Sequence, residues 1–174
     1  AQHIIGQYTQ PAVSRIMMQG LNPLEVPLRK VKRLVLFTDM VAFSAISDRL
    51  LIEDVSELVT AYLETCSTAI AKRGGEVTKF LGDGVMAYFD IDEADEALQS
   101  CVDIHDELRY LRVNAPTHSV LRLLFSGFGL ASGAVIEGSM GSSVKMDYTI
   151  IGEPVNTAAR LEALSRSVNK PVLM

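Results

Sequence analysis

Two aspartates stand at positions where a pair of carboxylates could hold divalent cations. Asp39 directly follows the apolar, β-branched segment RLVLFT, which is typical of a buried strand. Asp83 lies in a Gly-Asp-Gly turn between two β-type runs, VTKFL and VMAYF, and this pattern predicts a hairpin. In a split β-α-β-β arrangement the hairpin lies beside the first strand, so the two carboxylates could converge.

A converging carboxylate pair suits Mg²⁺ and similar hard cations, which one or two carboxylates commonly hold together with substrate phosphates. Two such cations would activate an attacking oxygen and neutralise a leaving pyrophosphate. The segment MVAFS after Asp39 adds consecutive backbone N–H groups leading toward a helix, which is a phosphate-cradling arrangement. An aspartate in a turn is also common for a purely local reason, because its side chain bonds its own backbone. Gly-Asp-Gly alone therefore leaves both interpretations open.

The remaining sequence predicts the elements that would position these residues. Apolar residues at helical spacing predict helices over 52–70 and 94–111. Further strands are predicted around LRLLFSGFGLA, AVIEG and DYTII, followed by a helix that opens at Pro154 and runs through VNTAARLEALSR. The order is β-α-β-β-α-β with an added hairpin and helix. This order indicates an α+β fold with helices on one face of a largely antiparallel sheet.

Composition and charge narrow the class of protein. The chain has 174 residues, of which 48% are hydrophobic and 21% charged, enough for one sizeable core. Its net charge of −5, with no stretch rich in Lys and Arg, argues against nucleic acid as a partner. No apolar run reaches the ~20 residues needed to span a bilayer, and the N-terminus lacks the pattern of a signal peptide. We therefore expect a cytoplasmic protein without a membrane segment, in which Cys66 and Cys101 are reduced core residues.

Three blocks of the sequence resemble, in order and spacing, the signature blocks of class III adenylyl and guanylyl cyclases. These blocks are FTDMVAFS, GGEVTKFLGDGVMAYF and DYTIIGEPVNTAARLE. The resemblance covers residues 31–174 and is greatest to the cyclase domain of BLUF-type photoactivated adenylyl cyclases. It implies a ferredoxin-like βαββαβ core with an added hairpin and helix, and a fold whose C-terminal part is missing. Residues 1–30 would be a connector from an upstream sensor, and a flavin would be bound only in that absent domain.

The resemblance assigns the metal and phosphate contacts to the first two blocks. It makes Asp39 and Asp83 the ligands of two Mg²⁺ or Mn²⁺ ions per site, with the backbone carbonyl of Met40 as a further ligand. The segment that would lie against the substrate phosphates consists of Val41, Ala42, Phe43 and Ser44. Many members also hold the triphosphate with an arginine in a later strand, and Gly127 stands at the position that we align with it.

Lys79 and Thr149 match the pair with which the family reads the nucleotide base. Adenine presents an acceptor at N1 and a donor at N6, whereas a Lys ammonium can only donate and a Thr hydroxyl can accept. Guanine would instead call for a carboxylate at the Lys position. The pair therefore favours ATP over GTP as substrate, and implies an adenylate cyclase that forms 3′,5′-cyclic AMP and pyrophosphate. Lys79 as an outward strand residue and Thr149 as a β-former remain alternative interpretations.

Asn156 and Arg160 match the pair that orients the ribose and stabilises the transition state. They are four residues apart, so one helix face would present both. An Arg guanidinium is suited to stabilising charge on the transferring phosphoryl oxygens. Without the family match, a polar pair on an exposed helix would be the simpler interpretation. The family builds each site across a homodimer, with the metals on one subunit and the base- and ribose-contacting residues on the other.

Two other functions stay open beside the adenylate cyclase. One is a guanylate cyclase, and the other is a catalytically silent cyclase-like module that serves dimerisation and signal transmission. The presence of all six candidate side chains argues against the silent module. A diguanylate cyclase of the polymerase type is disfavoured because GGEVT precedes the hairpin and does not form its turn.

Overall fold

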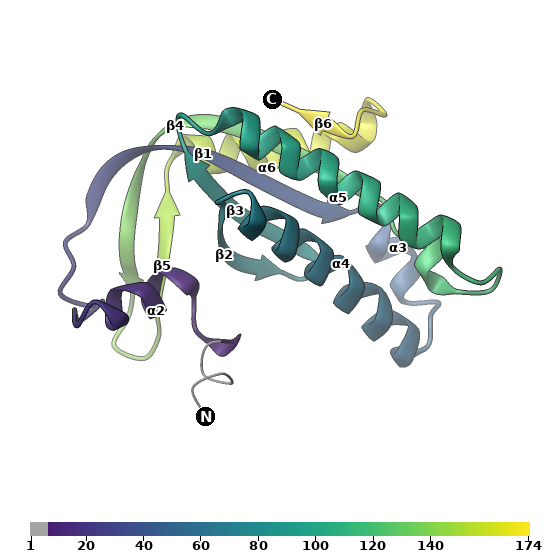
Figure 1. Cartoon of the computed structure of the whole chain (residues 1–174), viewed down its shortest axis with the longest axis horizontal. Helices are drawn as coiled ribbons and strands as arrows, with labels where there is room; N and C mark the ends of the chain where they lie inside the picture. Colours follow the sequence, from purple (N-terminus) through teal and green to yellow (C-terminus); the bar gives the residue numbers. More distant parts are fainter. Residues whose placement is uncertain (1–6) are drawn as a thin grey trace.

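The computed structural model describes residues 7–174, which form a six-stranded sheet with helices on both of its faces (Figure 1). Residues 1–6 of the expected connector lie outside the described residues. The elements in chain order are α2 (Pro11–Met18), β1 (Arg29–Met40), α3 (Phe43–Ser47), α4 (Ile52–Lys72), β2 (Glu76–Leu81), β3 (Gly84–Asp90), α5 (Ala94–Asn114), the 3₁₀ turn η1 (Val120–Leu123), β4 (Ser126–Gly141), β5 (Met146–Ile151), α6 (Glu153–Ser167) and β6 (Val172–Leu173).

The sheet has the strand order β2-β3-β1-β4-β5, and these neighbours are all antiparallel. The short β6 pairs with β4 in parallel. The central strand β1 is flanked on both sides, because it pairs with β3 over Arg33 to Thr38 and with β4 along its whole length. The end of β1 is therefore held firmly, which matters because Asp39 lies there.

Alternation along β1 divides the core into two parts. Leu34, Leu36 and Met40 are buried on the face that α4 and α5 cover. Val35 is buried on the opposite face, where Ala158 of α6 packs against it. Figure 1 shows the two long helices in front of the sheet and α6 behind it. The prediction of helices on a single face is therefore wrong, since α6 packs against the sheet from the other side.

The helix α6 lies unusually close to β4 because the strand offers almost no side chains beneath it. A Cβ atom placed on Gly129 would lie 2.1 Å from the backbone oxygen of Ala158. No side chain can be accommodated at such a distance without moving the helix. The glycine thus sets the depth of α6, and with it the position of every α6 residue relative to the end of β1.

Most of the predicted elements are confirmed, with differences in and beside the sheet. The helices over 52–70 and 94–111, the hairpin around Asp83 and the last helix are all present. The two strands expected around LRLLFSGFGLA and AVIEG are one continuous strand, β4, because β1 is long enough to pair with it throughout. Residues 120–123 form η1, whose first turn is capped by the Ser119 hydroxyl, which accepts from the Leu121 N–H. The strand β1 begins at Arg29, within the predicted connector.

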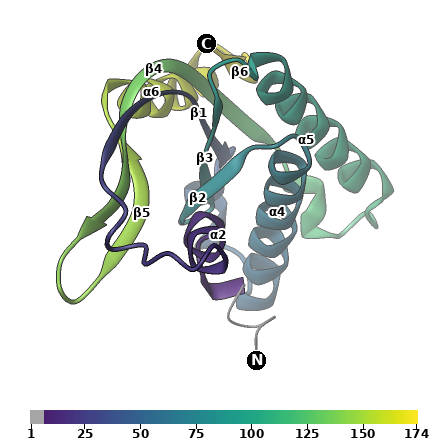
Figure 2. The ribbon, with the colours of Figure 1, turned by 60° about the vertical axis from the view of Figure 1, so that its left-hand side comes forward.

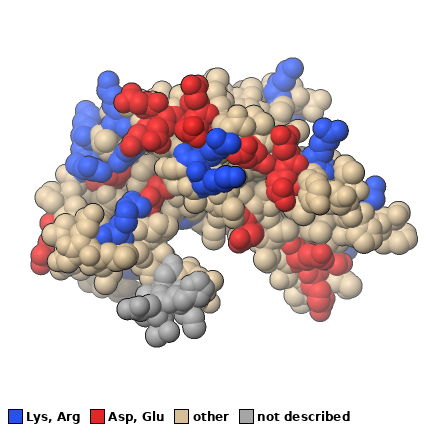
Figure 3. All heavy atoms as spheres, viewed as in Figure 1, with Lys and Arg blue, Asp and Glu red and all other residues tan. Residues whose placement is uncertain are grey.

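The surface and the cysteines agree with a well-packed domain. Cys66 and Cys101 are both buried and free. Acidic and basic side chains are interspersed over the face seen in Figure 3, which shows no continuous basic area. Within residues 7–174, none of the helices has the length and apolar character to cross a bilayer.

Candidate active site

The carboxyl groups of Asp39 and Asp83 meet at one end of the sheet. Asp39 is near the end of β1, and Asp83 lies in the turn that joins β2 to β3, the neighbour of β1. A Cβ atom on Gly84 would lie 3.5 Å from the carboxyl carbon of Asp39, so the turn packs directly against that side chain. Burial, followed by the hydrogen bond with Asp83 and its negative charge, raises the pKa of Asp39 to about 8. The convergence expected from the topology is thus present.

A third carboxylate, which the sequence reasoning missed, lies beside this pair. Glu162 of α6 is only 7% exposed, and its Oε1 has no hydrogen-bond partner among residues 7–174. Burial raises the pKa of Glu162, Arg166 opposes that shift and the charge of Asp83 adds to it. The signal was readable from helical spacing, because Glu162 follows the buried Ala158 by four residues on the same face.

The acidic end fits divalent cations by the chemistry of its donors. Asp83 Oδ2 is buried and accepts no hydrogen bond from any residue that the structure describes, which is costly for a carboxylate oxygen unless a cation takes it. In residues 7–174 no group of three or more His, Cys, Asp or Glu side chains is arranged around one ion position. A cation here would therefore take the two aspartates and complete its shell with water and phosphate oxygens, as Mg²⁺ commonly does.

A buried hydroxyl cluster supports the strand end behind Asp39. The Ser126 hydroxyl lies 2.7 Å from Thr38 Oγ1 and 2.6 Å from Tyr62 Oη, and Tyr62 also hydrogen bonds Thr38. These residues come from β4, β1 and α4, so the cluster ties the helix to the two strands at one point. Tyr62 is completely buried. The backbone that carries Asp39 is therefore anchored from below as well as from both sides.

The segment after Asp39 offers fewer free N–H groups than the sequence predicts. The Val41 N–H donates to the Phe125 carbonyl at 2.8 Å, and the Met40 N–H donates to Asp39 Oδ1 at 2.9 Å. The expectation of a free backbone donor at Val41 is therefore wrong, because the start of β4 has taken it. The amides of Ala42, Phe43 and Ser44 donate to no backbone carbonyl of residues 7–174.

Ala42 carries the backbone turn that starts α3. Its φ of 60° lies in the left-handed region, which costs a residue with a Cβ atom roughly 1 kcal/mol or more. Such strain persists only where the surrounding structure fixes the backbone, and here the Val41 N–H is fixed by β4. Met40, whose carbonyl is the predicted extra metal ligand, has a side chain that is 1% exposed and packs in the main core.

Lys79 and Thr149 lie on the two opposite edge strands, β2 and β5, yet these edges approach one another. The amide of Gln10 bridges them, because its Nε2 donates to the carbonyl oxygens of Thr78 at 2.9 Å and of Tyr148 at 2.8 Å. The sheet is curled enough for one side chain to contact both edges, and Figure 2 shows α2 below β2. The residues that follow Thr78 and Tyr148 are the two predicted base readers.

Both predicted base readers keep their polar groups unpaired within the described chain. Lys79 is half-buried, and no carboxylate of residues 7–174 lies within ion-pairing distance of it. Thr149 is 7% exposed, and its buried hydroxyl oxygen has no hydrogen-bond partner in residues 7–174. A buried hydroxyl is normally satisfied, so its lack of a partner is a feature that a bound polar ligand would explain.

Asn156 and Arg160 share the solvent side of α6 and are not brought to the carboxylates of their own chain. Both are exposed, and Arg160 lies 3.5 Å from Glu153 on the same helix. The inward face of α6 instead carries the buried Glu162, whereas Asn156 and Arg160 face solvent. The ribose and transition-state pair is thus separated from the metal pair within one chain.

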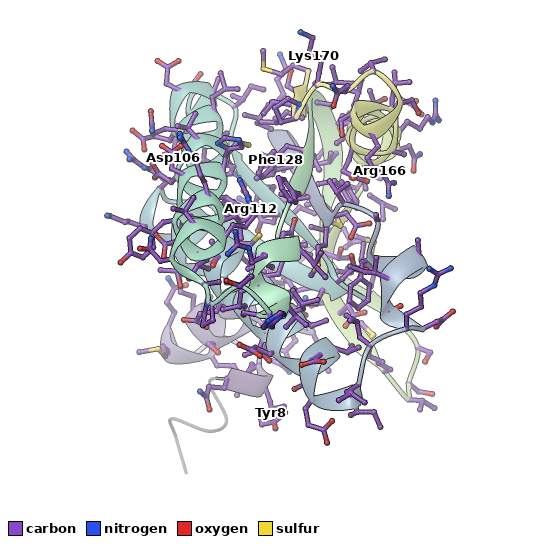
Figure 4. The ribbon with its side chains drawn as sticks, turned by 90° about the vertical axis from the view of Figure 1, so that its right-hand side faces the viewer. Tyr8, Asp106, Arg112, Phe128, Arg166 and Lys170 are labelled. Carbon is purple, nitrogen blue, oxygen red and sulfur yellow. The ribbon has the colours of Figure 1, made fainter. Side chains whose placement is uncertain are left out.

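The position of Gly127 is filled by α6. Gly127 pairs with Asp39 across β1 and β4, and a Cβ atom there would lie 2.6 Å from the Ser165 hydroxyl. A larger side chain, such as the arginine of many family members, would therefore collide with α6. Basic side chains instead line an adjoining cavity of about 240 Å³ (Figure 4). Its lining includes Val41, Gly127, Arg112, Arg166 and Lys170.

The chain matches a family model over most of its length. The model describes the adenylate and guanylate cyclase catalytic domain and covers residues 29–171, a range that holds every predicted site residue. The chain belongs to this family. The predicted resemblance and fold class are thereby confirmed.

Relatives of this cyclase domain include light-regulated enzymes. It is 30% identical over 170 residues to the photoactivated adenylate cyclase subunit alpha of Euglena gracilis, covering 96% of this chain and 16% of that protein. The structure of a bacterial light-regulated adenylyl cyclase superposes with a TM-score of 0.95 at 42% identity, covering 98% of this chain and 51% of that one. The adenylyl cyclase CyaB from P. aeruginosa gives 0.71 at 30% identity, covering 79% and 74%. The cyclase domain thus spans about a sixth of the Euglena relative and half of the bacterial one.

Proposed function

We propose that this cyclase domain converts ATP to 3′,5′-cyclic AMP and pyrophosphate with two Mg²⁺ or Mn²⁺ ions, at sites formed by a homodimer. The observation that carries the proposal is the meeting of the Asp39 and Asp83 carboxyls, one oxygen of which is buried without a partner. The three relatives described above are named adenylyl or adenylate cyclases, which supports adenine as the base.

Asp39 and Asp83 would hold the cations, with the Met40 carbonyl as an additional ligand. Cations bound there would lower the pKa of the ribose 3′-hydroxyl and would neutralise charge on the leaving pyrophosphate. Asp39 would lose the proton that its raised pKa retains in the absence of metal. The substrate phosphates would lie against the segment from Val41 to Ser44, where the amides from Ala42 onward can donate.

Lys79 and Thr149 would read the adenine. The Lys79 ammonium donates to N1, and the Thr149 hydroxyl accepts from the N6 amino group. Guanine would place its N1–H donor against the Lys79 ammonium, which can only donate, and a site that leaves such groups unpaired rejects the ligand strongly. The unpaired hydroxyl of Thr149 and the absence of a carboxylate near Lys79 within the described residues support this assignment.

Asn156 and Arg160 would act on the partner subunit's substrate. Asn156 orients the ribose, and Arg160 donates to the phosphoryl oxygens on which charge accumulates in the transition state. Their exposure on α6, away from Asp39 and Asp83 of the same chain, is what a site shared between two subunits requires. We further propose regulation by a light sensor upstream, on the strength of the photoactivated relatives.

Complementation between inactive variants tests the shared site directly. Asp39→Ala and Arg160→Ala should each abolish cyclic AMP formation from ATP and Mn²⁺. Mixed in equal amounts and allowed to exchange subunits, they should regain about a quarter of the original activity, because half of the dimers then hold one intact site of two. No recovery in a mixture shown to contain heterodimers would contradict the shared site. Faster turnover of GTP than of ATP by the unsubstituted chain would contradict the choice of base.

A catalytically silent cyclase-like module is the second candidate, and one observation favours it. The phosphate-holding arginine of many family members has no counterpart at Gly127, where α6 leaves no room. In that case ATP with Mn²⁺ would raise the melting temperature of the protein, but no cyclic nucleotide would form. Detectable product that Asp39→Ala abolishes would rule this candidate out.

A further inference from the structure

Gln10 joins the two edges of the sheet through three hydrogen bonds of its side-chain amide. Its Nε2 donates to Thr78 O at 2.9 Å and to Tyr148 O at 2.8 Å, and its Oε1 accepts from the Tyr148 N–H at 2.8 Å. The Gln10 amide therefore occupies the place of a peptide group between β2 and β5. These strands are separated by three others in the sheet order, so no ladder hydrogen bond joins them.

The local irregularity of β2 makes this bridge possible. The pairing register with β3 shifts between Val77 and Lys79, which leaves Thr78 without a partner in the ladder. Bulges of this kind free a backbone group and redirect the next side chain, and they are common beside active sites. The freed carbonyl of Thr78 accepts from Gln10, and the redirected residue is Lys79.

Gln10 thus hydrogen bonds the residue that precedes each proposed base reader, Thr78 before Lys79 and Tyr148 before Thr149. We infer that Gln10 is a positioning residue for the base, and that it holds Lys79 and Thr149 at the separation that adenine requires. This inference rests on the proposed function. Gln10 itself touches no reacting atom, and it acts through the backbone of the two strands.

Through the Gln10 bridge, the segment that contains α2 is connected directly to the proposed base site. Gln10 is the residue before α2, and the next turn is fixed by Ala12, which is 5% exposed, and by Arg15, which pairs with Glu76 of β2 at 2.8 Å. A displacement of α2 would draw Gln10 away from β5 while the ion pair still held α2 to β2. The separation of Lys79 and Thr149 would then change, whereas Asp39 and Asp83 would keep their own supports.

The connector supplies matched variants for a test in the full chain. Gln10→Ala removes the three hydrogen bonds, and Gln10→Glu retains the acceptor for the Tyr148 N–H but sets a carboxylate against two carbonyl oxygens. Gln19→Ala is the control, because Gln19 is an exposed glutamine in the same connector.

The measurements are KM and kcat for ATP and GTP, together with the rise in melting temperature that Mn²⁺ alone produces. For Gln10→Ala and Gln10→Glu we expect KM for ATP to rise about tenfold and the preference for ATP over GTP to fall about tenfold, since the polar groups remain but are misplaced. The Mn²⁺-induced shift should be unchanged, as should all values for Gln19→Ala. An unaltered KM and preference, or an equal loss of the Mn²⁺-induced shift, would overturn the inference.

A readout independent of turnover separates this inference from the proposed function. Hydrogen exchange of the Tyr148 amide should accelerate at least about tenfold in Gln10→Ala and stay unchanged in Gln19→Ala. If the unsubstituted chain made no cyclic AMP, the proposed function would fail, and binding of ATP against GTP would still test the bridge. If the chain were active and Gln10→Ala discriminated like the original, the bridge alone would fail.

Discussion

The proposed metal end of the site, at Asp39 and Asp83, and the proposed base end, at Lys79 and Thr149, are built in contrasting ways. At the metal end, Asp39 and Asp83 come from strands that are neighbours in the sheet, and a buried hydroxyl cluster anchors the strand that carries Asp39. At the base end, Lys79 and Thr149 come from opposite edges, and a side chain from outside the ladder joins them. The first arrangement is fixed by the sheet itself, whereas the second depends on a side chain that comes from outside the sheet.

This difference indicates which part of the domain an upstream signal could regulate. The strands β3 and β4 flank the strand that carries Asp39, and Asp83 lies in the turn that leads into β3, so only a change in the sheet or in that turn would separate the carboxylates. The base end can open by the loss of one bridging amide, which is a small change in free energy. An upstream signal that moves α2 would therefore act on nucleotide binding and leave the metal ligands in place.

The largest effect is expected at the metal end. Asp83→Ala should lower kcat/KM for ATP at least about a thousandfold, or about 4 kcal/mol in transition-state stabilisation, because the cations lose one of two protein carboxylates. Asp48→Asn, at an exposed aspartate after α3, is the control and should leave activity unchanged. Substantial activity in Asp83→Ala would show that Asp83 is not needed to hold the cations.

A specificity change is expected at the base end. Lys79→Glu should lower the ratio of kcat/KM for ATP to that for GTP about a hundredfold, because a carboxylate accepts from the guanine N1 and repels the adenine N1. The concentration of Mn²⁺ required for activity should not change, because Asp39 and Asp83 are untouched. An unchanged nucleotide preference would show that Lys79 does not contact the base.

The stability of the metal-free protein should depend on pH through Asp39. Its pKa is raised to about 8 in the folded state, so its contribution to stability is full below about pH 4 and is lost as the pH rises through about 8. Asp39→Asn should flatten this decline and stabilise the protein at pH 9 by ~1–2 kcal/mol, with allowance for solvent screening of a partly exposed group. Chemical denaturation at several pH values in chelator checks this, and identical pH profiles for the two proteins would contradict it.

The smallest effect concerns the support behind the metal end. Tyr62→Phe should lower the free energy of unfolding by ~1 kcal/mol, because it removes one hydroxyl from a cluster in which Thr38 and Ser126 still bond each other. Urea denaturation measures the loss. No loss, or a loss as large as that of a core deletion, would show that the cluster does not anchor β1 as described.

The same contrast explains which features of the site could be predicted from the sequence and which could not. The meeting of Asp39 and Asp83 was predictable, because it follows from a strand, a hairpin and their adjacency in a split β-α-β-β order. The approach of Lys79 to Thr149 was not derivable from the pattern of residues, because sheet curl and the Gln10 bridge are long-range features. Resemblance to the cyclase family predicted that Lys79 and Thr149 act together, but it did not indicate which contacts bring the two residues close.

Other misses have equally local causes. Separate strands were predicted around LRLLFSGFGLA and AVIEG, but pairing with the long β1 makes them one continuous strand, β4. The Val41 amide was expected to be free, but the Phe125 carbonyl accepts from it. Glu162 was overlooked although its spacing from Ala158 indicated the buried face of α6, and its burial follows from how deeply α6 sits over Gly129. In each case a tertiary contact decided what the local pattern left open.

Calorimetric titration of Mn²⁺ into the full chain tests the central claim most directly, if it is performed at pH 7 in buffers of different ionisation enthalpy. Two aspartates that hold a proton between them should bind Mn²⁺ with the release of about one proton, since the pKa of Asp39 is about 8. Binding should be lost in Asp83→Ala, and the release of the proton should be lost in Asp39→Asn. Mn²⁺ binding of unchanged affinity in Asp83→Ala would contradict the account.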